Sequence, residues 1–310
     1  MNVLFMGTPD FACFSLSALL QSPHRVTAVV TQPDKPRGRG YTLTPPPVKV
    51  AALEAGIPVY QPTTLRDESF AELLREINPD VIVVVAYGKI LPQNVLDHPK
   101  YGCINVHGSL LPEYRGAAPM QRAIIDGCTV TGITTMYMAA GLDTGDMLLR
   151  EECPIADSDN FETIHDKLGA LGASMIVRTL DGLAEGVLTR VPQNEAEATY
   201  AAKILKEDCA VSFDTDARTV HNLIRGLSPI PLSFTHTPDG KLLKLVASEI
   251  ADEDTPHDCP GKVSSLDGGI TVACRPGSVT VLQVLPEGKG RMSAADFIRG
   301  RKIAMGDILS

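Results

Sequence analysis

The run of residues from 80 to 86, Asp-Val-Ile-Val-Val-Val-Ala, is the feature that most constrains the fold of this chain. Apolar side chains occupy consecutive positions, so a strand formed here would be apolar on both faces. Such a strand is typical of the centre of a parallel sheet, because crossover helices then cover each side of it. The run therefore predicts a layered α/β domain.

Shorter apolar runs alternate with amphipathic stretches through the first half of the chain. Thr8 fits the N-cap of a helix that has Pro9 at its first position. Further helices are predicted at 118–126 and 160–185, and strands at 2–6, 25–31, 58–60, 103–106, 132–138 and 146–151. This alternation predicts an α/β fold with a Rossmann-like, doubly wound and mostly parallel sheet in residues 1–188.

The pattern changes after residue 188. Residues 189–202 are polar, contain a proline and lack apolar periodicity, so they are interpreted as a linker. Beyond them a helix is predicted at 217–227 and short strands at 242–248, 261–263, 269–274 and 279–285, separated by Gly, Pro and Asp. Residues 203–310 are therefore expected to form a small β-barrel or sandwich. The length of 310 residues is typical of two domains.

Composition argues against several classes of protein. The 28 Lys and Arg stand against 37 Asp and Glu, a formal net charge of -9, which argues against coating nucleic acid by bulk positive charge. No apolar run reaches about 18 residues, and the N-terminus lacks the basic region of a signal peptide. The seven cysteines include no C-x-x-C pair. We therefore expect a cytoplasmic protein with reduced thiols, no metal site and no membrane contact.

Four segments follow predicted strands and are expected to meet at one edge of the sheet, where open α/β sheets bind ligands. They are residues 7–10, 32–49, 105–112 and 141–146. Asn105 and His107 are two positions apart on an extended segment, so their side chains share one face. An amide and an imidazole there could donate hydrogen bonds to a developing oxyanion, and the imidazole could also move a proton. Asp143, in a turn between two glycines, could orient the imidazole.

Each of these residues also has a simpler interpretation. Asn105 and His107 could be satisfied by backbone groups at a strand end, and Asp143 could cap its own turn. Asp146 is a competing carboxylate. The segment at 7–10 lacks G-x-G-x-x-G, and Ser109 lacks the G-x-S-x-G context of a nucleophile, so direct transfer without a covalent enzyme intermediate is the simpler hypothesis.

The segment at 32–49 is rich in positive charge. It contains Lys35, Arg37, Arg39 and Lys49, and Asp34 is its only acidic residue. It could be a solvated surface loop. Alternatively it could lie against a polyanion, with arginine contacting phosphate or base edges.

Several of these segments together resemble the bacterial methionyl-tRNA formyltransferases. They are MGTPDFA, TQPDKPRGRG, CINVHGSLLPEYRGAAPMQRAI and GLDTGDM, with YAAKILKED and NLIRGLSPIP in the second domain. The resemblance covers nearly the whole chain. N-x-H-x-S-L-L-P alone is shared by all folate-dependent formyltransferases, whereas RGAAP, PDKPRGRG and the C-terminal domain point to the tRNA enzyme.

The resemblance implies transfer of a formyl group from 10-formyltetrahydrofolate to the methionine α-amine of initiator methionyl-tRNA. The family's catalytic residues fall on Asn105, His107 and Asp143, and its folate-binding residues on Ser109, Leu110, Leu111 and Pro112. Its tRNA-inserting loop falls on residues 34–44, and its C-terminal domain is an OB-type barrel that binds tRNA. The expected tRNA contacts are Lys35, Arg37, Arg39 and Lys206. A monomer is expected, with no DNA partner.

The nearest alternative is a nucleotide amino-sugar formyltransferase. Such an enzyme would share N-x-H, a similar Asp and a small β-rich second domain, but it would not need the PDKPRGRG loop. A purine-pathway formyltransferase would lack the C-terminal domain. A binding protein without catalysis would not need Asn105, His107 and Asp143 together.

Overall fold

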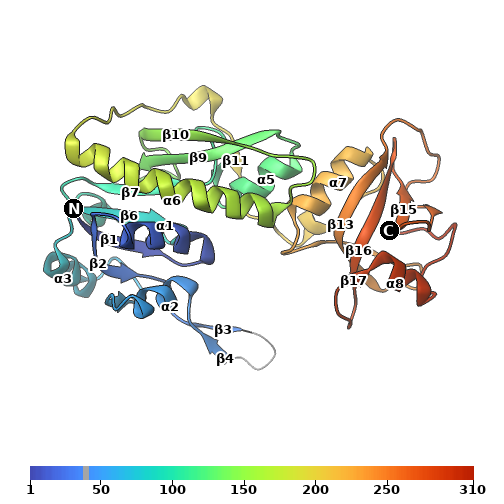
Figure 1. Cartoon of the computed structure of the whole chain (residues 1–310), viewed down its shortest axis with the longest axis horizontal. Coiled ribbons are helices and arrows are strands. Elements are labelled where there is room, and N and C mark those ends of the chain that lie inside the picture. The colour runs from blue at the N-terminus through green and yellow to red at the C-terminus, as the bar shows by residue number, and fades with distance from the viewer. Residues whose placement is uncertain (38–41) are drawn as a thin grey trace. The chain divides into compact units, whose positions relative to one another are not determined.

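The structure is a computed structural model that describes residues 1–37 and 42–310. It comprises two compact units (Figure 1). The N-terminal unit is made of Met1–Gly116, Thr131–Pro154 and His165–Tyr200, and the C-terminal unit of Ala117–Val130, Ile155–Ile164 and Ala201–Ser310. None of the helices in the described ranges has a stretch both long and apolar enough to cross a bilayer.

The N-terminal unit is built on a seven-stranded sheet in the order β10-β9-β7-β6-β1-β2-β5. Its strands are β1 (Asn2–Gly7), β2 (Arg25–Val30), β5 (Val59–Tyr60), β6 (Val81–Val85), β7 (Cys103–His107), β9 (Val130–Tyr137) and β10 (Met147–Pro154). From β5 to β7 neighbouring strands are parallel, whereas β9 runs antiparallel to β7. Every residue of β6 is buried. The predicted doubly wound, mostly parallel sheet is thus confirmed.

Helices cover both faces of this sheet. On one face α3 (Glu68–Ile77) and α4 (Gln93–Leu96) pack on a cluster that includes Leu4, Ile82 and Cys103. On the other face α6 (Phe161–Glu185) brings Gly172 against Val106 of β7. Side chains alternate along a strand, so Asn105 and His107 are on the same face of β7 as Cys103. The site residues therefore emerge from the α3 and α4 side of the sheet.

Two short helices and a hairpin were not predicted. They are α2 (Pro47–Glu54), α4 and the pair β3 (Lys35–Arg37) and β4 (Thr42–Thr44). The longer α3 was missed as well, although Asp67 caps it by accepting a hydrogen bond from Phe70 N at 3.1 Å.

The predicted Thr8 cap is wrong. Helix α1 (Asp10–Leu20) has Pro9 at its N-cap, without a side-chain hydrogen bond. The Thr8 hydroxyl instead donates to the Tyr87 carbonyl oxygen at 3.0 Å, and the Gln32 side chain donates to the same oxygen at 3.1 Å. These contacts connect the segments that follow β1, β2 and β6.

The C-terminal unit contains an antiparallel sheet in the order β12-β13-β16-β15-β14, with β17 paired to β16. The strands are β12 (Ser233–His236), β13 (Leu242–Asp252), β14 (Val263–Ser265), β15 (Ile270–Ala273), β16 (Ser278–Pro286) and β17 (Met292–Ser293). Register shifts between β13 and β16 mark bulges, which bend a sheet. The sheet curls into a half-barrel, as expected for an OB-like domain (Figure 1).

Helices complete the C-terminal unit. They are α5 (Pro119–Ile125), α7 (Ala217–Gly226) and α8 (Ala294–Arg299). The core contains Val220 and Ile224 of α7, Leu245 of β13 and Phe297 of α8. Of these elements, α8, β12 and β17 were not predicted, because each is short and its apolar pattern is too brief to stand out.

A matched pair of isoleucines tests the burial of β6. Ile82 is 0% exposed in the core, whereas Ile90 is 76% exposed. We expect Ile82→Ala to lower the unfolding free energy of the N-terminal unit by about 2–5 kcal/mol, because it leaves a cavity in a packed core. Ile90→Ala should change it by less than about 0.5 kcal/mol. Urea unfolding followed by circular dichroism measures both values, and equal effects would contradict this packing.

Candidate active site

The structure brings Asp143 beside His107. The Asp143 Oδ2 atom lies 3.8 Å from His107 Nδ1, and both side chains are largely buried. The predicted position of the turn that carries Asp143 was wrong, although the predicted pair forms. Tyr137 at the end of β9 pairs with Ile104 near the start of β7, so β9 ends at the opposite edge from the one expected. The turn after β9 nevertheless reaches His107.

A hydrogen bond to the backbone shows that one ring nitrogen of His107 carries a proton. His107 Nε2 lies 2.9 Å from the Tyr114 carbonyl oxygen. Because a carbonyl oxygen only accepts, Nε2 carries a proton and donates it. The other nitrogen, Nδ1, then faces Asp143 across a gap too long for a direct hydrogen bond. Nδ1 is therefore the nitrogen of this ring that is left to contact a bound molecule.

The Asn105 side-chain amide has no hydrogen-bond partner among the described residues. Its residue is 8% exposed, and its side chain makes no hydrogen bond to any other residue in the described parts of the chain. A polar group this nearly buried is costly unless water or a ligand supplies its hydrogen bonds. The Asn105 amide is thus free to bind an oxygen next to His107.

The turn that carries Asp143 has a backbone conformation that few residue types can adopt. Asp143 has a φ of 52°, in the left-handed region that few residues other than glycine adopt. Two positions later, a Cβ atom on Gly145 would lie 1.8 Å from the Tyr137 carbonyl oxygen, so only glycine fits there. The Asp143 Oδ2 atom accepts a hydrogen bond from Gly116 N at 2.9 Å. This contact to a backbone group has no signature in the sequence.

The Ser-Leu-Leu-Pro segment forms the turn after β7. The Ser109 hydroxyl donates to the Glu113 carbonyl oxygen at 2.6 Å, and Leu111 N donates to the Thr134 hydroxyl at 3.1 Å. Ser109, Leu111 and Pro112 are buried, and only Leu110 is half-buried. Their internal partners hold the turn beside His107.

The basic segment divides into paired and unpaired charges. Lys49 Nζ lies 2.8 Å from Asp34 Oδ2 and also donates to Gln61. Hydrogen bonds from Lys49 and Gln61 lower the pKa of Asp34, so this carboxyl is ionised at neutral pH. Lys35 on β3 is exposed. Arg37 ends β3, and Arg39 lies outside the described residues.

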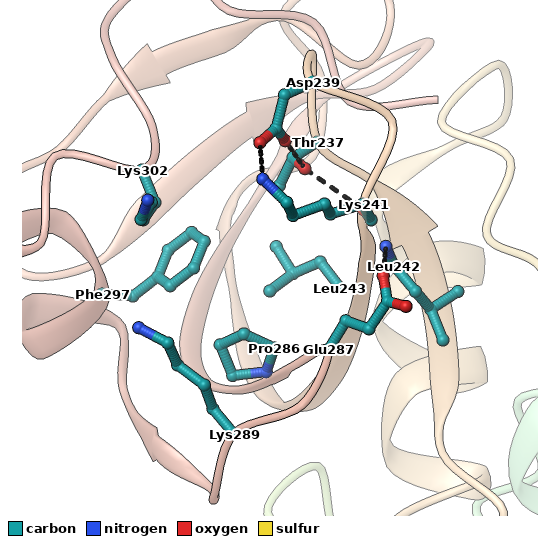
Figure 2. Close-up of a pocket in the computed structure, with 10 residues that line it drawn as sticks. All are labelled: Thr237, Asp239, Lys241, Leu242, Leu243, Pro286, Glu287, Lys289, Phe297 and Lys302. Atoms are coloured by element: carbon teal, nitrogen blue, oxygen red, sulfur yellow. Dashed lines mark hydrogen bonds and ion pairs between the residues drawn. The ribbon is translucent and has the colours of Figure 1, made fainter.

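A cavity of about 180 Å³ opens on the C-terminal unit (Figure 2). Its lining includes Phe297 and the lysines Lys241, Lys289 and Lys302. Lys241 pairs with Asp239, and hydrogen bonds from Lys241 and Thr237 lower the pKa of Asp239 to about 2.

The other two lysines of this cavity are unpaired. Lys289 and Lys302 are exposed and form no ion pair with any residue that the structure describes. Lys206 is also exposed on this unit. The cavity therefore offers free positive charge beside an apolar ring, although the chain as a whole is acidic.

Within residues 1–37 and 42–310, no three His, Cys, Asp or Glu side chains gather as metal ligands would. The site at the end of β7 is instead made of the Asn105 amide, the His107 imidazole and the Asp143 carboxylate. Such a group can stabilise an oxyanion and relay a proton.

Comparison with protein families gives two matches. The formyl transferase model matches residues 1–180, and the model of the formyl transferase C-terminal domain matches residues 203–302. The methionyl-tRNA formyltransferase of Geotalea daltonii is 49% identical over 99% of this chain and 97% of its own length. That of Acetivibrio thermocellus is 46% identical over 100% of this chain and 99% of its own length.

Solved structures share the fold at lower identity. The N-formyltransferase from Helicobacter canadensis, in complex with folinic acid and dTDP-3-aminofucose, has a TM-score of 0.69 and 17% identity, over 91% of this chain and 98% of its own. HypX from Aquifex aeolicus, in complex with tetrahydrofolic acid, has a TM-score of 0.64 and 17% identity. That match covers 96% of this chain and 47% of HypX.

Proposed function

The chain belongs to the methionyl-tRNA formyltransferase family, and from this premise we propose that it transfers the formyl group of 10-formyltetrahydrofolate to the α-amine of methionyl initiator tRNA. The observation that carries the proposed chemistry is the unpartnered Asn105 amide on the same face as His107, which in turn faces Asp143. This arrangement fits attack of an amine on a formyl carbon. It requires no covalent link to the enzyme.

In the proposed reaction, the α-amine nitrogen forms a bond to the formyl carbon, and the bond from that carbon to the folate nitrogen breaks. Asn105 through its amide N–H, and His107 through Nδ1 when that nitrogen also carries a proton, donate hydrogen bonds to the oxyanion that develops on the formyl oxygen. Asp143 positions His107 and, through water, takes the proton that the amine loses. The folate nitrogen leaves after it gains a proton, and the proton that the amine gives up through Asp143 and water balances the one that this leaving nitrogen takes up. Holding both substrates in contact supplies much of the rate.

The proposed folate contacts are those that the Ser-Leu-Leu-Pro motif predicts. We propose that Ser109, Leu110, Leu111 and Pro112 form one wall of the folate site. The internal hydrogen bonds of Ser109 and Leu111 support a rigid wall and leave Leu110 as the most accessible side chain. A preformed wall would limit the entropy that is lost when folate binds.

The same proposal assigns residues 1–188 to formyl transfer, residues 189–202 to a linker and residues 203–310 to tRNA binding. Lys35, Arg37, Arg39 and Lys206 are the proposed tRNA contacts. Lys289 and Lys302 at the cavity of Figure 2 extend this set, because neither is neutralised by a described acidic partner. We further propose that the enzyme acts as a monomer in the cytoplasm.

The amino-sugar alternative is tested by direct competition. Sugar N-formyltransferases share the fold, and the Helicobacter canadensis enzyme was solved with a nucleotide amino sugar. The chain is incubated with 10-formyltetrahydrofolate and either charged initiator tRNA or dTDP-3-aminofucose. We expect formylmethionine on the tRNA and no comparable product on the sugar. A better rate with the sugar would overturn the proposed acceptor.

Substitution of the proposed catalytic residues tests the mechanism. We expect His107→Ala and Asp143→Ala each to lower kcat by about 10²–10⁴-fold, because general acid–base catalysis contributes about that much. Circular dichroism and thermal unfolding should show a folded protein in both cases. Near-normal turnover in both variants would exclude the roles assigned to these side chains.

The cavity lysines are tested by a double substitution. Lys289→Ala with Lys302→Ala should raise the KM for tRNA and reduce the slope of log affinity against log salt by about 0.9 per lost phosphate contact. The KM for the folate substrate should not change. Lys100→Ala, on the N-terminal unit, is the control for a lost lysine charge. Equal effects of the double variant on both substrates would argue against a tRNA contact here.

A further inference from the structure

Residues 191–199 lie between the two family matches and run along the N-terminal unit. We call them the linker strap. At one end, Val191 and Met147 exchange backbone hydrogen bonds of 2.9 Å in each direction, which attaches the strap to the start of β10. At the other end, Thr199 N donates to the Pro112 carbonyl oxygen at 3.3 Å. Most strap residues are exposed, so these polar contacts hold the strap in place instead of apolar packing.

Gln193 contacts the turn that carries Asp143. Its amide nitrogen donates to the carbonyl oxygens of Asp143 and Gly145, at 2.8 Å each. Both amide protons of Gln193 are therefore used on this one turn. Asp143 has a left-handed backbone conformation, which persists only where the surrounding structure holds it.

Arg115 holds the Gln193 amide in the orientation that these bonds need. Its Nε atom donates to Gln193 Oε1 at 3.0 Å, which leaves the amide nitrogen directed at the turn. The other guanidinium nitrogens donate to both carboxylate oxygens of Glu195, at 2.9 and 2.8 Å. Arg115 is 0% exposed, and a buried charge requires such a partner. The strap thus supplies both the residue that Arg115 orients and the residue that neutralises it.

The far end of the strap supports His107 from its other side. The Thr199 hydroxyl accepts a hydrogen bond from Tyr114 N at 2.8 Å, and the Thr199 carbonyl oxygen accepts one from Arg115 N at 2.8 Å. Tyr114 has a φ of 57°, and its own carbonyl oxygen accepts the hydrogen bond from His107 Nε2. The strap therefore contacts both left-handed residues at the site.

We propose that the linker strap positions Asp143 and His107 for formyl transfer, with Gln193 as the central positioning residue. This inference rests on the proposed function of the site. Gln193 fixes the turn that presents the carboxylate, and Thr199 fixes the backbone that accepts from the imidazole. The strap leads directly into residues 203–302, the C-terminal domain match, so the connection between the two domains also helps to shape the catalytic site.

Two substitutions of Gln193 separate the turn contact from the Arg115 contact. Gln193→Met keeps the length of the side chain but removes both donors to the turn and also the oxygen that accepts from Arg115. Gln193→Glu keeps an oxygen for Arg115 but presents an acceptor to two carbonyl oxygens. In each variant we expect kcat to fall about 10- to 100-fold, the cost of misplacing a reacting group by about 1 Å, with both KM values changed less than about threefold.

The pH dependence distinguishes positioning from general structural damage. A protonated Glu side chain regains one donor, and the charged side chain in contact with position 193 is Arg115, which favours the ionised form. The kcat of Gln193→Glu relative to wild type should therefore begin to recover only as the pH falls from about 6 to about 4, through the ordinary range of a Glu carboxyl. The relative kcat of Gln193→Met should stay flat, because it has no group to titrate. Glu197→Gln is the matched control, since Glu197 is exposed in the same strap and its side chain has Asn194 as its one hydrogen-bond partner among the described residues. It should retain wild-type kcat.

Hydrogen–deuterium exchange of residues 141–147 gives a readout that needs no substrate. Exchange there should accelerate in Gln193→Met and remain at the wild-type level in Glu197→Gln. Faster exchange together with lower kcat supports the inference. Unchanged exchange, or faster exchange with wild-type kcat, overturns it. If wild type formylates no tRNA while exchange in Gln193→Met still accelerates, the proposed function fails and the strap contact stands.

Discussion

The pairing of β7 with β6 and β9 is the interaction on which the proposed site depends. Because β6 is buried along its whole length, it fixes β7 as a parallel neighbour in the middle of the sheet. The alternation of side chains along β7 then places Asn105 and His107 on one face. Without this register, the amide and the imidazole would have no common direction, and the turn that carries Asp143 would have no partner.

The backbone around these residues includes unfavourable conformations that hydrogen bonds hold in place. Asp143 and Tyr114 both adopt left-handed conformations, and each is held by hydrogen bonds from several directions. Such conformations cost about 1–3 kcal/mol and persist where neighbouring structure maintains them. The linker strap supplies a large part of that support. A segment that joins two domains thereby takes part in the geometry of the site in one of them.

Ion pairing decides which positive charges of this protein are available to a partner, more than the number of charged residues does. The net charge of -9 coexists with exposed cations that have no acidic partner among the described residues, such as Lys289 and Lys302. Lys49 stands in the basic segment but is neutralised by Asp34. Counting charges along the chain treats these lysines alike, whereas the structure separates those available to a polyanion from those that stabilise the protein itself. A small set of lysines without acidic partners fits the proposal that this acidic protein binds one nucleic acid partner.

The amino-acid sequence by itself determined the layered fold and the shared face of Asn105 and His107. Strands such as β6 and β7 and the helix α6 follow from local apolar patterns, and Asn105 and His107 share a face because they are two apart on a strand. Tertiary structure alone decided the path of Asp143, which reaches His107 although β9 runs opposite to the expected direction. It also decided the contacts of Arg115 with Gln193 and Glu195, 78 and 80 positions away. Periodicity reports only on neighbours along the chain, and partners this distant are chosen when folding closes the loops between them.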